Sequence, residues 1–138
     1  MKKKLYALLF LLLLVGGLFY IKATQKKYTV KKMFENVFSA TEIIDEENKL
    51  YQKYGIYFTE NGWEEALGNR IPLLGANLYQ IYKETPESIN IDIKDQGKKD
   101  WYICKVEVKY GNEESNNFLF TIQVMFDGKQ WLIESISR

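Results

Sequence analysis

The chain lacks histidine altogether and has a single cysteine, Cys104, among its 138 residues. The absence of histidine removes the commonest general base and the usual zinc ligand. One cysteine cannot form an internal disulfide or a thiolate metal cluster. Because Cys104 shares the apolar face of its strand with Tyr102, Val106 and Val108, we expect a small buried side chain there and not a reactive thiol.

Acidic residues are absent before Glu35, whereas eight of the nineteen basic residues precede position 33. After Lys2, Lys3 and Lys4, the segment 5–21 carries no charge and is mostly apolar. As a helix it would be about 25 Å long, at the short end of what crosses a hydrocarbon core. Residues 1–22 are therefore predicted to be a signal-anchor or transmembrane helix. The membrane is thus a predicted partner of the chain, which would cross it once.

Two properties of this leader stay open. Its apolar run exceeds a typical signal-peptide core, which favours an uncleaved anchor, but small residues near Gly17 and Ala23 permit cleavage and secretion. Lysines on both sides leave the positive-inside rule undecided. Moving the charged N-terminal tail outward against the membrane potential is costly, which favours an extracytoplasmic domain. The lysines after the span keep a cytoplasm-facing adaptor as the alternative.

The rest of the chain is predicted to be one domain, 33–138, preceded by a basic juxtamembrane linker, 23–32. From Met33 onward there are 11 basic and 18 acidic residues, a net charge of −7. This balance disfavours nucleic-acid binding, and the basic stretch before it is explained as membrane flanking.

The first half of the domain has helical periodicity. Thr29 is expected to cap a helix, with a break near Asp45 and Glu46, and Gly55 is a natural C-terminal stop. Thr59 or Asn61 is expected to open a further helix that Pro72 interrupts, and 73–82 continues as helix.

The second half alternates apolar and polar residues, with turn residues at 95–100 and 111–117. Asp127-Gly128 predicts a two-residue hairpin pairing Phe126 with Lys129 and Val124 with Trp131. The predicted fold class is α+β: an N-terminal transmembrane helix, then helices packed on one face of a curved four-stranded antiparallel sheet.

This order of elements, ending in the sequence from Asp127 to Ile133, resembles the nuclear transport factor 2-like superfamily, whose cystatin-like fold is cone-shaped. The resemblance covers about residues 29 to 138. Membrane-tethered bacterial members are similar to assembly components of conjugation and secretion machines. It therefore implies a protein-binding role in an envelope assembly, although function belongs to the site and not to the fold.

Enzymes of the cone fold place acids, tyrosines or histidines on the concave sheet face. The residues predicted for that face here include no carboxylate: Tyr102, Cys104, Val106, Val108, Tyr110, Phe118, Phe120, Ile122, Val124, Trp131 and Ile133. The sequence also has no calcium loop and no glycine-rich phosphate loop. We expect no catalytic residue, cofactor or metal, and the alternative is a secreted binder or enzyme that uses the cone cavity.

The opposite sheet face carries apolar residues that could meet a protein. They are predicted to be Trp101, Ile103, Leu119, Met125, Leu132 and Ile136. If they form a contiguous patch, they mark a protein contact. We expect this outer face to bind a protein partner or a second copy in a homodimer.

Overall fold

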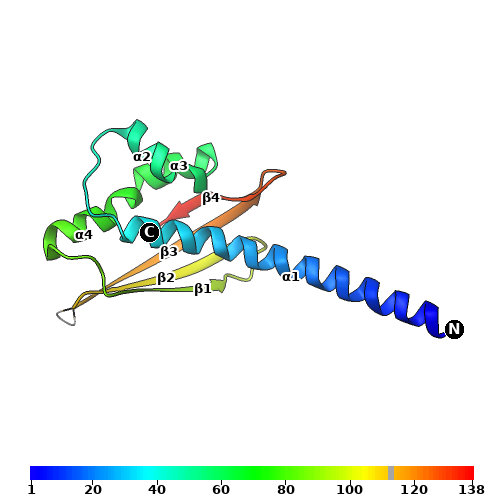
Figure 1. Ribbon diagram of the computed structural model, residues 1–138. Coiled ribbons are helices and arrows are strands. Elements are labelled where there is room, and N and C mark those ends of the chain that lie inside the picture. Colours follow the sequence, from blue (N-terminus) through cyan, green and yellow to red (C-terminus); the bar gives the residue numbers. More distant parts are fainter. Residues whose placement is uncertain (112–113) are drawn as a thin grey trace.

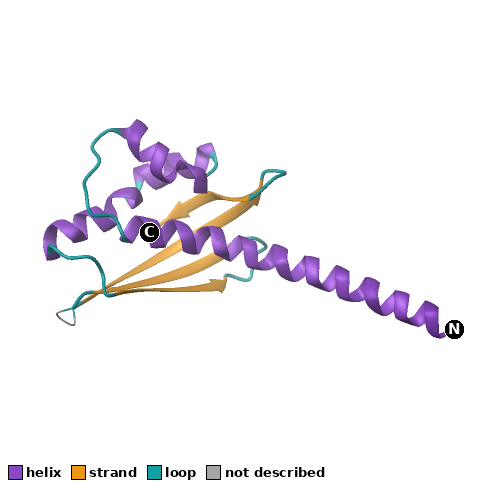
Figure 2. Ribbon diagram, in the orientation of Figure 1, coloured by secondary structure: helices purple, strands orange, loops and turns teal. Residues whose placement is uncertain are grey.

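The computed structural model describes residues 1–111 and 114–138, apart from the side chains of 21–23. Short helices and one very long helix lie on one side of a four-stranded antiparallel sheet (Figures 1 and 2). The elements are α1 (Lys2–Phe38), α2 (Glu47–Tyr54), η1 (Gly55–Tyr57), α3 (Glu60–Gly68), η2 (Ile71–Leu73), α4 (Leu74–Tyr82), β1 (Ser88–Asp95), β2 (Trp101–Lys109), β3 (Ser115–Phe126) and β4 (Trp131–Ser137). The predicted α+β class with its antiparallel sheet is confirmed.

Helix α1 is continuous through the segment predicted to be a linker. The prediction that a helix begins at Thr29 is wrong, because no proline or glycine interrupts the chain between Ile21 and Phe38. Thr29 instead lies within the helix, with its Oγ1 3.3 Å from the Gln25 carbonyl oxygen one turn earlier. At 37 residues the helix is about 55 Å long. Figure 1 shows its N-terminal part projecting beyond the sheet.

The short helices follow the sequence signals closely. Thr59 caps α3 by accepting a hydrogen bond from the Gly62 N–H at 3.1 Å. Of the two predicted starts, Thr59 and Asn61, Thr59 is therefore the observed one. Pro72 lies in η2, between α3 and α4, and Lys83 ends α4 in the left-handed conformation. A single parallel bridge joins Phe58 to Ile133 and brings this helical layer onto β4.

The sheet is a simple meander in the order β1-β2-β3-β4. The predicted two-residue hairpin is wrong: Phe126 pairs with Trp131, so four residues, 127–130, make the turn. The Asp127 carboxylate stabilises it by accepting hydrogen bonds from the Lys129 and Gln130 N–H groups, both at 2.8 Å. Of the turn predicted at 111–117, residues 112–113 lie outside the described residues, and Ser115 already belongs to β3.

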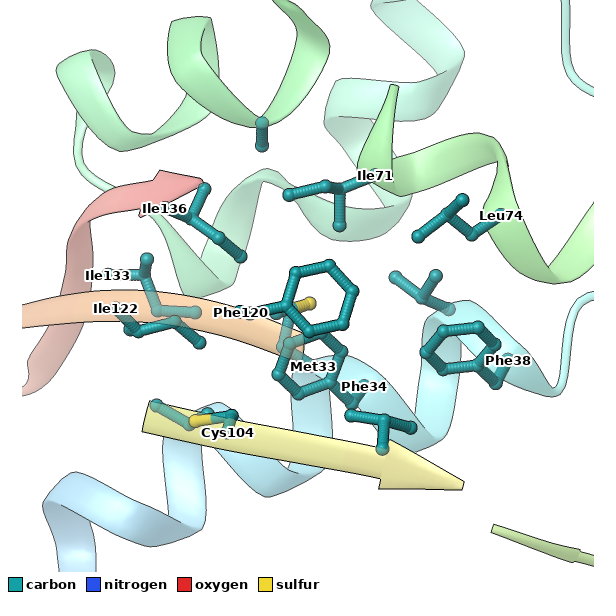
Figure 3. Close-up of a cluster of buried hydrophobic side chains, with 14 of the residues drawn as sticks. Met33, Phe34, Phe38, Ile71, Leu74, Cys104, Phe120, Ile122, Ile133 and Ile136 are labelled. Carbon is teal, nitrogen blue, oxygen red and sulfur yellow. The ribbon is translucent and has the colours of Figure 1, made fainter. Parts of the chain in front are cut away.

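A β-bulge in β4 changes which residues face the helices. Gln123 pairs with Ser135 but the next residue, Val124, pairs with Ile133, so Glu134 is an extra residue in β4. Beyond it the alternation is inverted. Ile136 therefore pairs with Ile122 and is fully buried on the helix side of the sheet (Figure 3).

The core lies between α1 and the inner face of the sheet. Phe34 and Phe38 of α1 meet Phe120 and Phe118 of β3, with ring centroids 4.7 and 5.1 Å apart. Figure 3 shows Met33 and Phe34 of α1 among the sheet side chains, with Ile71 and Leu74 closing the far side. The C-terminal third of α1 is thus the central helix of the domain, while its N-terminal part is not covered by it.

Candidate interaction surface on the outer face of the sheet

The concave inner face is packed by side chains. All the residues predicted for this face are buried, except Trp131, which is half-buried at the edge. Tyr110 stacks on Tyr82 with ring centroids 4.0 Å apart, and burial raises the pKa of its hydroxyl to about 12. Burial likewise raises the pKa of the Cys104 thiol to about 12. These groups stay protonated at neutral pH, and Phe34 and Phe38 of α1 pack against this face.

The sequence has two runs of adjacent acidic residues, Asp45-Glu46-Glu47 and Glu64-Glu65, and in each run an acid has a structural contact. Glu65 accepts hydrogen bonds from Ser135 Oγ at 2.7 Å and from the Ile136 N–H at 2.9 Å, and these bonds lower the pKa of its carboxyl. Glu46 forms an exposed ion pair with Lys49. Within the described residues, no group of three or more acidic or cysteine side chains is placed to hold a metal ion.

The outer face brings five of the six predicted interface residues together. Lys105 is opposite Leu119, Ile103 is opposite Thr121, and Met125 is opposite Leu132. Trp101 lies two residues before Ile103, on the same side of β2. Apolar side chains therefore form a bent strip from β3 to β2 and back over β3 to β4, around Thr121 and Gln123. Its members, each within reach of the next, are Leu119, Ile103, Trp101, Met125 and Leu132.

Their exposure differs along this strip. Leu119 is 56% exposed, Met125 44% and Ile103 37%, whereas Trp101 and Leu132 are half-buried. Helices α1 to α4 all lie on the other side of the sheet (Figure 1). The apolar strip is thus uncovered, and it is the kind of surface that protein contacts use.

The sixth predicted residue, Ile136, is not part of this surface. Strict alternation along β4 put it on the outer face, but the bulge at Glu134 turns it into the core, where it is fully buried. No feature of the β4 sequence marks the bulge. It coincides with contacts from α3: the Thr59 N–H donates to the Ile133 carbonyl at 3.0 Å, and Asn61 Nδ2 donates to the Glu134 carbonyl at 2.9 Å.

Charged residues of both signs border the apolar strip. On β1 and β2 the outer face carries Asp92, Lys94, Lys105, Glu107 and Lys109. Asp92 pairs with Lys94 at 3.4 Å and Glu107 with Lys109 at 3.3 Å; Glu107 is half-buried and the other three are exposed. These alternating charges nearly balance, so the face has no strong field of one sign.

Sequence reasoning missed a set of contacts where α1 leaves the domain. Lys26 Nζ lies 2.7 Å from Asp100 Oδ1, and 4.5 Å from the centroid of the Trp131 ring. Thr29 Oγ1 donates a hydrogen bond to the Trp131 carbonyl at 3.1 Å. These contacts tie α1 to the β1–β2 turn and to β4. No local pattern could reveal them, because the partners are more than seventy residues apart.

Comparison with known proteins gives a fold neighbour only. No family model matches the chain, and no curated protein matches it. A crystal structure of a protein of unknown function from Bacteroides thetaiotaomicron aligns with a TM-score of 0.54 at 14% identity, over 90% of this chain and 96% of that one. At this identity the likeness concerns the fold alone.

Proposed function

We propose that this chain is a non-enzymatic, membrane-anchored domain that lies outside the cytoplasm and contacts a second copy of itself through the outer face of its sheet. The observation that carries the proposal is the uncovered apolar strip from Leu119 to Leu132. Membership of the nuclear transport factor 2-like superfamily is part of the proposal, supported by the order of helices and strands. A role in an envelope assembly fits such a domain.

Anchoring is supported by the N-terminal part of α1. Among the described residues it is the helix with a stretch long and apolar enough to cross a membrane or to act as a signal sequence. Its apolar side chains are exposed, so nothing in the domain covers them. Lys2, Lys3 and Lys4 precede this stretch, and keeping these charges inside leaves the domain outside.

The orientation of the strip favours a neighbour in the same membrane. Because α1 packs along the inner face, the outer face looks sideways from the helix axis (Figure 1). If α1 crosses the bilayer, the outer face stands upright on the membrane, and the strip faces neighbouring molecules in the same membrane. A second copy has the same anchor and therefore carries its own strip at the same height.

Charge supports self-association over a partner of strong opposite charge. A two-fold contact brings the same patch together from both copies, so a patch of one sign would repel itself. Here Asp92, Lys105 and Glu107 alternate, and one copy can place its lysines opposite the acids of the other. The apolar strip would form the centre of that contact and the charges its rim.

Cross-linking in membranes tests the contact. We would replace Leu119 with cysteine in the full chain and add a short bis-maleimide to membranes that contain it. The natural Cys104 is fully buried, so it should not react. A cross-linked dimer is expected for Leu119→Cys and not for Gln52→Cys, which is exposed on α2. Adding Ile103→Glu should abolish the product by placing a charge in the strip.

A contact that is unaffected by Ile103→Glu, or equal cross-linking of Gln52→Cys, would refute the outer face as the interface. Sidedness needs its own measurement. A C-terminal epitope on the full-length chain should be removed by protease added to intact cells. A protected epitope on a full-length chain would place the domain in the cytoplasm.

A further inference from the structure

We infer that the end of the domain from which α1 emerges docks onto an anionic lipid surface. This end consists of the β1–β2 turn (96–100), the β3–β4 turn (127–130) and the part of α1 around Lys26. Figure 1 shows both turns on the side of the sheet toward which α1 projects. The inference rests on the proposed anchoring of α1 and adds a second, reversible contact with the bilayer.

The height of this end along α1 matches the headgroup layer. Lys26 is five residues beyond Ile21, the end of the uncharged run, which corresponds to about 7.5 Å of helix. The polar layer on each side of the hydrocarbon core is about 5–8 Å thick. Because Lys26 holds Asp100 at 2.7 Å, the β1–β2 turn lies at the same height. The neighbouring lysines of the turns therefore face lipid headgroups.

The charge of this end suits anionic lipid. It carries five lysines against three aspartates: Lys26, Lys27, Lys98, Lys99 and Lys129 against Asp95, Asp100 and Asp127. Two of these acids are already engaged, Asp100 by Lys26 and Asp127 by backbone N–H groups. No ion pair found in the described part of the chain involves Lys98, Lys99 or Lys129.

The same end carries aromatic side chains, which favour the boundary between lipid and water. Phe126 is exposed, Trp101 and Trp131 are half-buried, and the Phe126 and Trp131 rings lie 5.4 Å apart. Tyr20 is exposed at the end of the uncharged run of α1. A basic and aromatic end on a body of net charge −7 would orient that body, because an anionic surface repels the rest of it.

Hydrogen bonds within the two turns fix the backbone that carries Lys98, Lys99 and Lys129. The Asp127 carboxylate closes the β3–β4 turn, and Gly128 has the positive φ of 100° that this turn needs. In the β1–β2 turn, the N–H of Trp101 donates to the Lys98 carbonyl at 3.1 Å, and Lys98 Nζ lies over the Trp101 ring. Docking therefore requires little ordering of the backbone.

Depth-dependent quenching of the full chain tests the inference. A fluorophore on Gln130→Cys reports the β3–β4 turn, and one on Gln52→Cys reports α2; both side chains are exposed and Cys104 is buried. The vesicles contain phosphatidylcholine with a headgroup nitroxide, with or without phosphatidylglycerol. We expect stronger quenching at position 130 when phosphatidylglycerol is present, lost at high salt, and no change at position 52.

The decisive variant replaces Lys98, Lys99 and Lys129 with glutamine. At about fivefold per lysine, the ratio of docked to undocked domain should fall about a hundredfold in anionic vesicles. The matched control replaces three exposed lysines of the helical layer, Lys49, Lys53 and Lys83, and should leave the quenching unchanged.

Flotation of the vesicles separates the two ways to fail. A chain that does not float with vesicles after an alkaline wash contradicts the anchoring, and the docking with it. If the chain floats, but its quenching at position 130 changes neither with phosphatidylglycerol nor with replacement of the three lysines, the docking alone is overturned. Equal losses in the triple variant and its control would also overturn it, because general charge would then be responsible.

Discussion

Gly62 of α3 lies against the backbone of β4, and this contact gives a sharp test of the fold. A Cβ atom added there would lie 2.0 Å from the backbone carbonyl oxygen of Ile133, next to the bulge. Gly68, in the same helix, has no neighbouring atom within 4 Å of such a Cβ. Helix propensity alone predicts that alanine stabilises both positions, so the two substitutions separate local preference from tertiary contact.

The expected cost of Gly62→Ala can be worked from these distances. Ordinary contact begins at 3.4 Å, so α3 would have to move from β4 by about 1.4 Å. That shift would stretch the bonds from the Thr59 N–H and from Asn61 Nδ2, now 3.0 and 2.9 Å, beyond hydrogen-bonding range. The charged Glu65 bonds to β4 would stretch with them. At about 1 kcal/mol per neutral bond and about 2 kcal/mol for the charged group, the loss is about 3–4 kcal/mol.

Urea unfolding of the full chain in detergent micelles, followed by tryptophan fluorescence, measures this loss. With a slope of about 2 kcal/mol per molar, Gly62→Ala should lower the unfolding midpoint by about 1.5–2 M urea. Gly68→Ala should raise it slightly, by about 0.3 M, because alanine restricts the unfolded chain. If Gly62→Ala unfolds at the wild-type midpoint or above it, α3 does not lie against the bulge as described.

Two further predictions concern the sheet. Ile136→Ala should destabilise the domain by about 2–5 kcal/mol in the same urea assay, because Ile136 is buried, whereas Leu119→Ala on the outer face should change it by less than about 0.5 kcal/mol; similar effects would argue against the bulge. Burial raises the pKa of the Cys104 thiol to about 12, so little thiolate exists up to pH 9; labelling of the folded chain by Ellman's reagent should stay slow over this range and become fast in urea. Rapid labelling of the folded chain would show that β2 is not covered by α1.

The local signals that predicted correctly are those whose physical cause is also local. Thr59 caps α3 with its own side chain, three residues from the N–H that it binds. Alternation along β2 and β3 identified the buried faces, because successive side chains of a strand point to opposite sides. The predicted helix start at Thr29 was wrong. The residues before Thr29 are equally able to be helical, and their charge does not end a helix, so α1 continues through them.

The sequence by itself determined the division into an uncharged leader and an acidic α+β body, the order of the strands and most of the core. These follow from charge, periodicity and turn residues, which act over a few positions. Tertiary structure decided the rest. The bulge at Glu134 lies where Asn61 of α3 donates a hydrogen bond to a carbonyl of β4. Because of the bulge, Ile136 lies in the core and not on the predicted outer face. The contacts of Lys26 with Asp100 and Trp131 hold this part of α1 against the sheet, and they form only when residues distant in the chain meet after the sheet has folded onto α1.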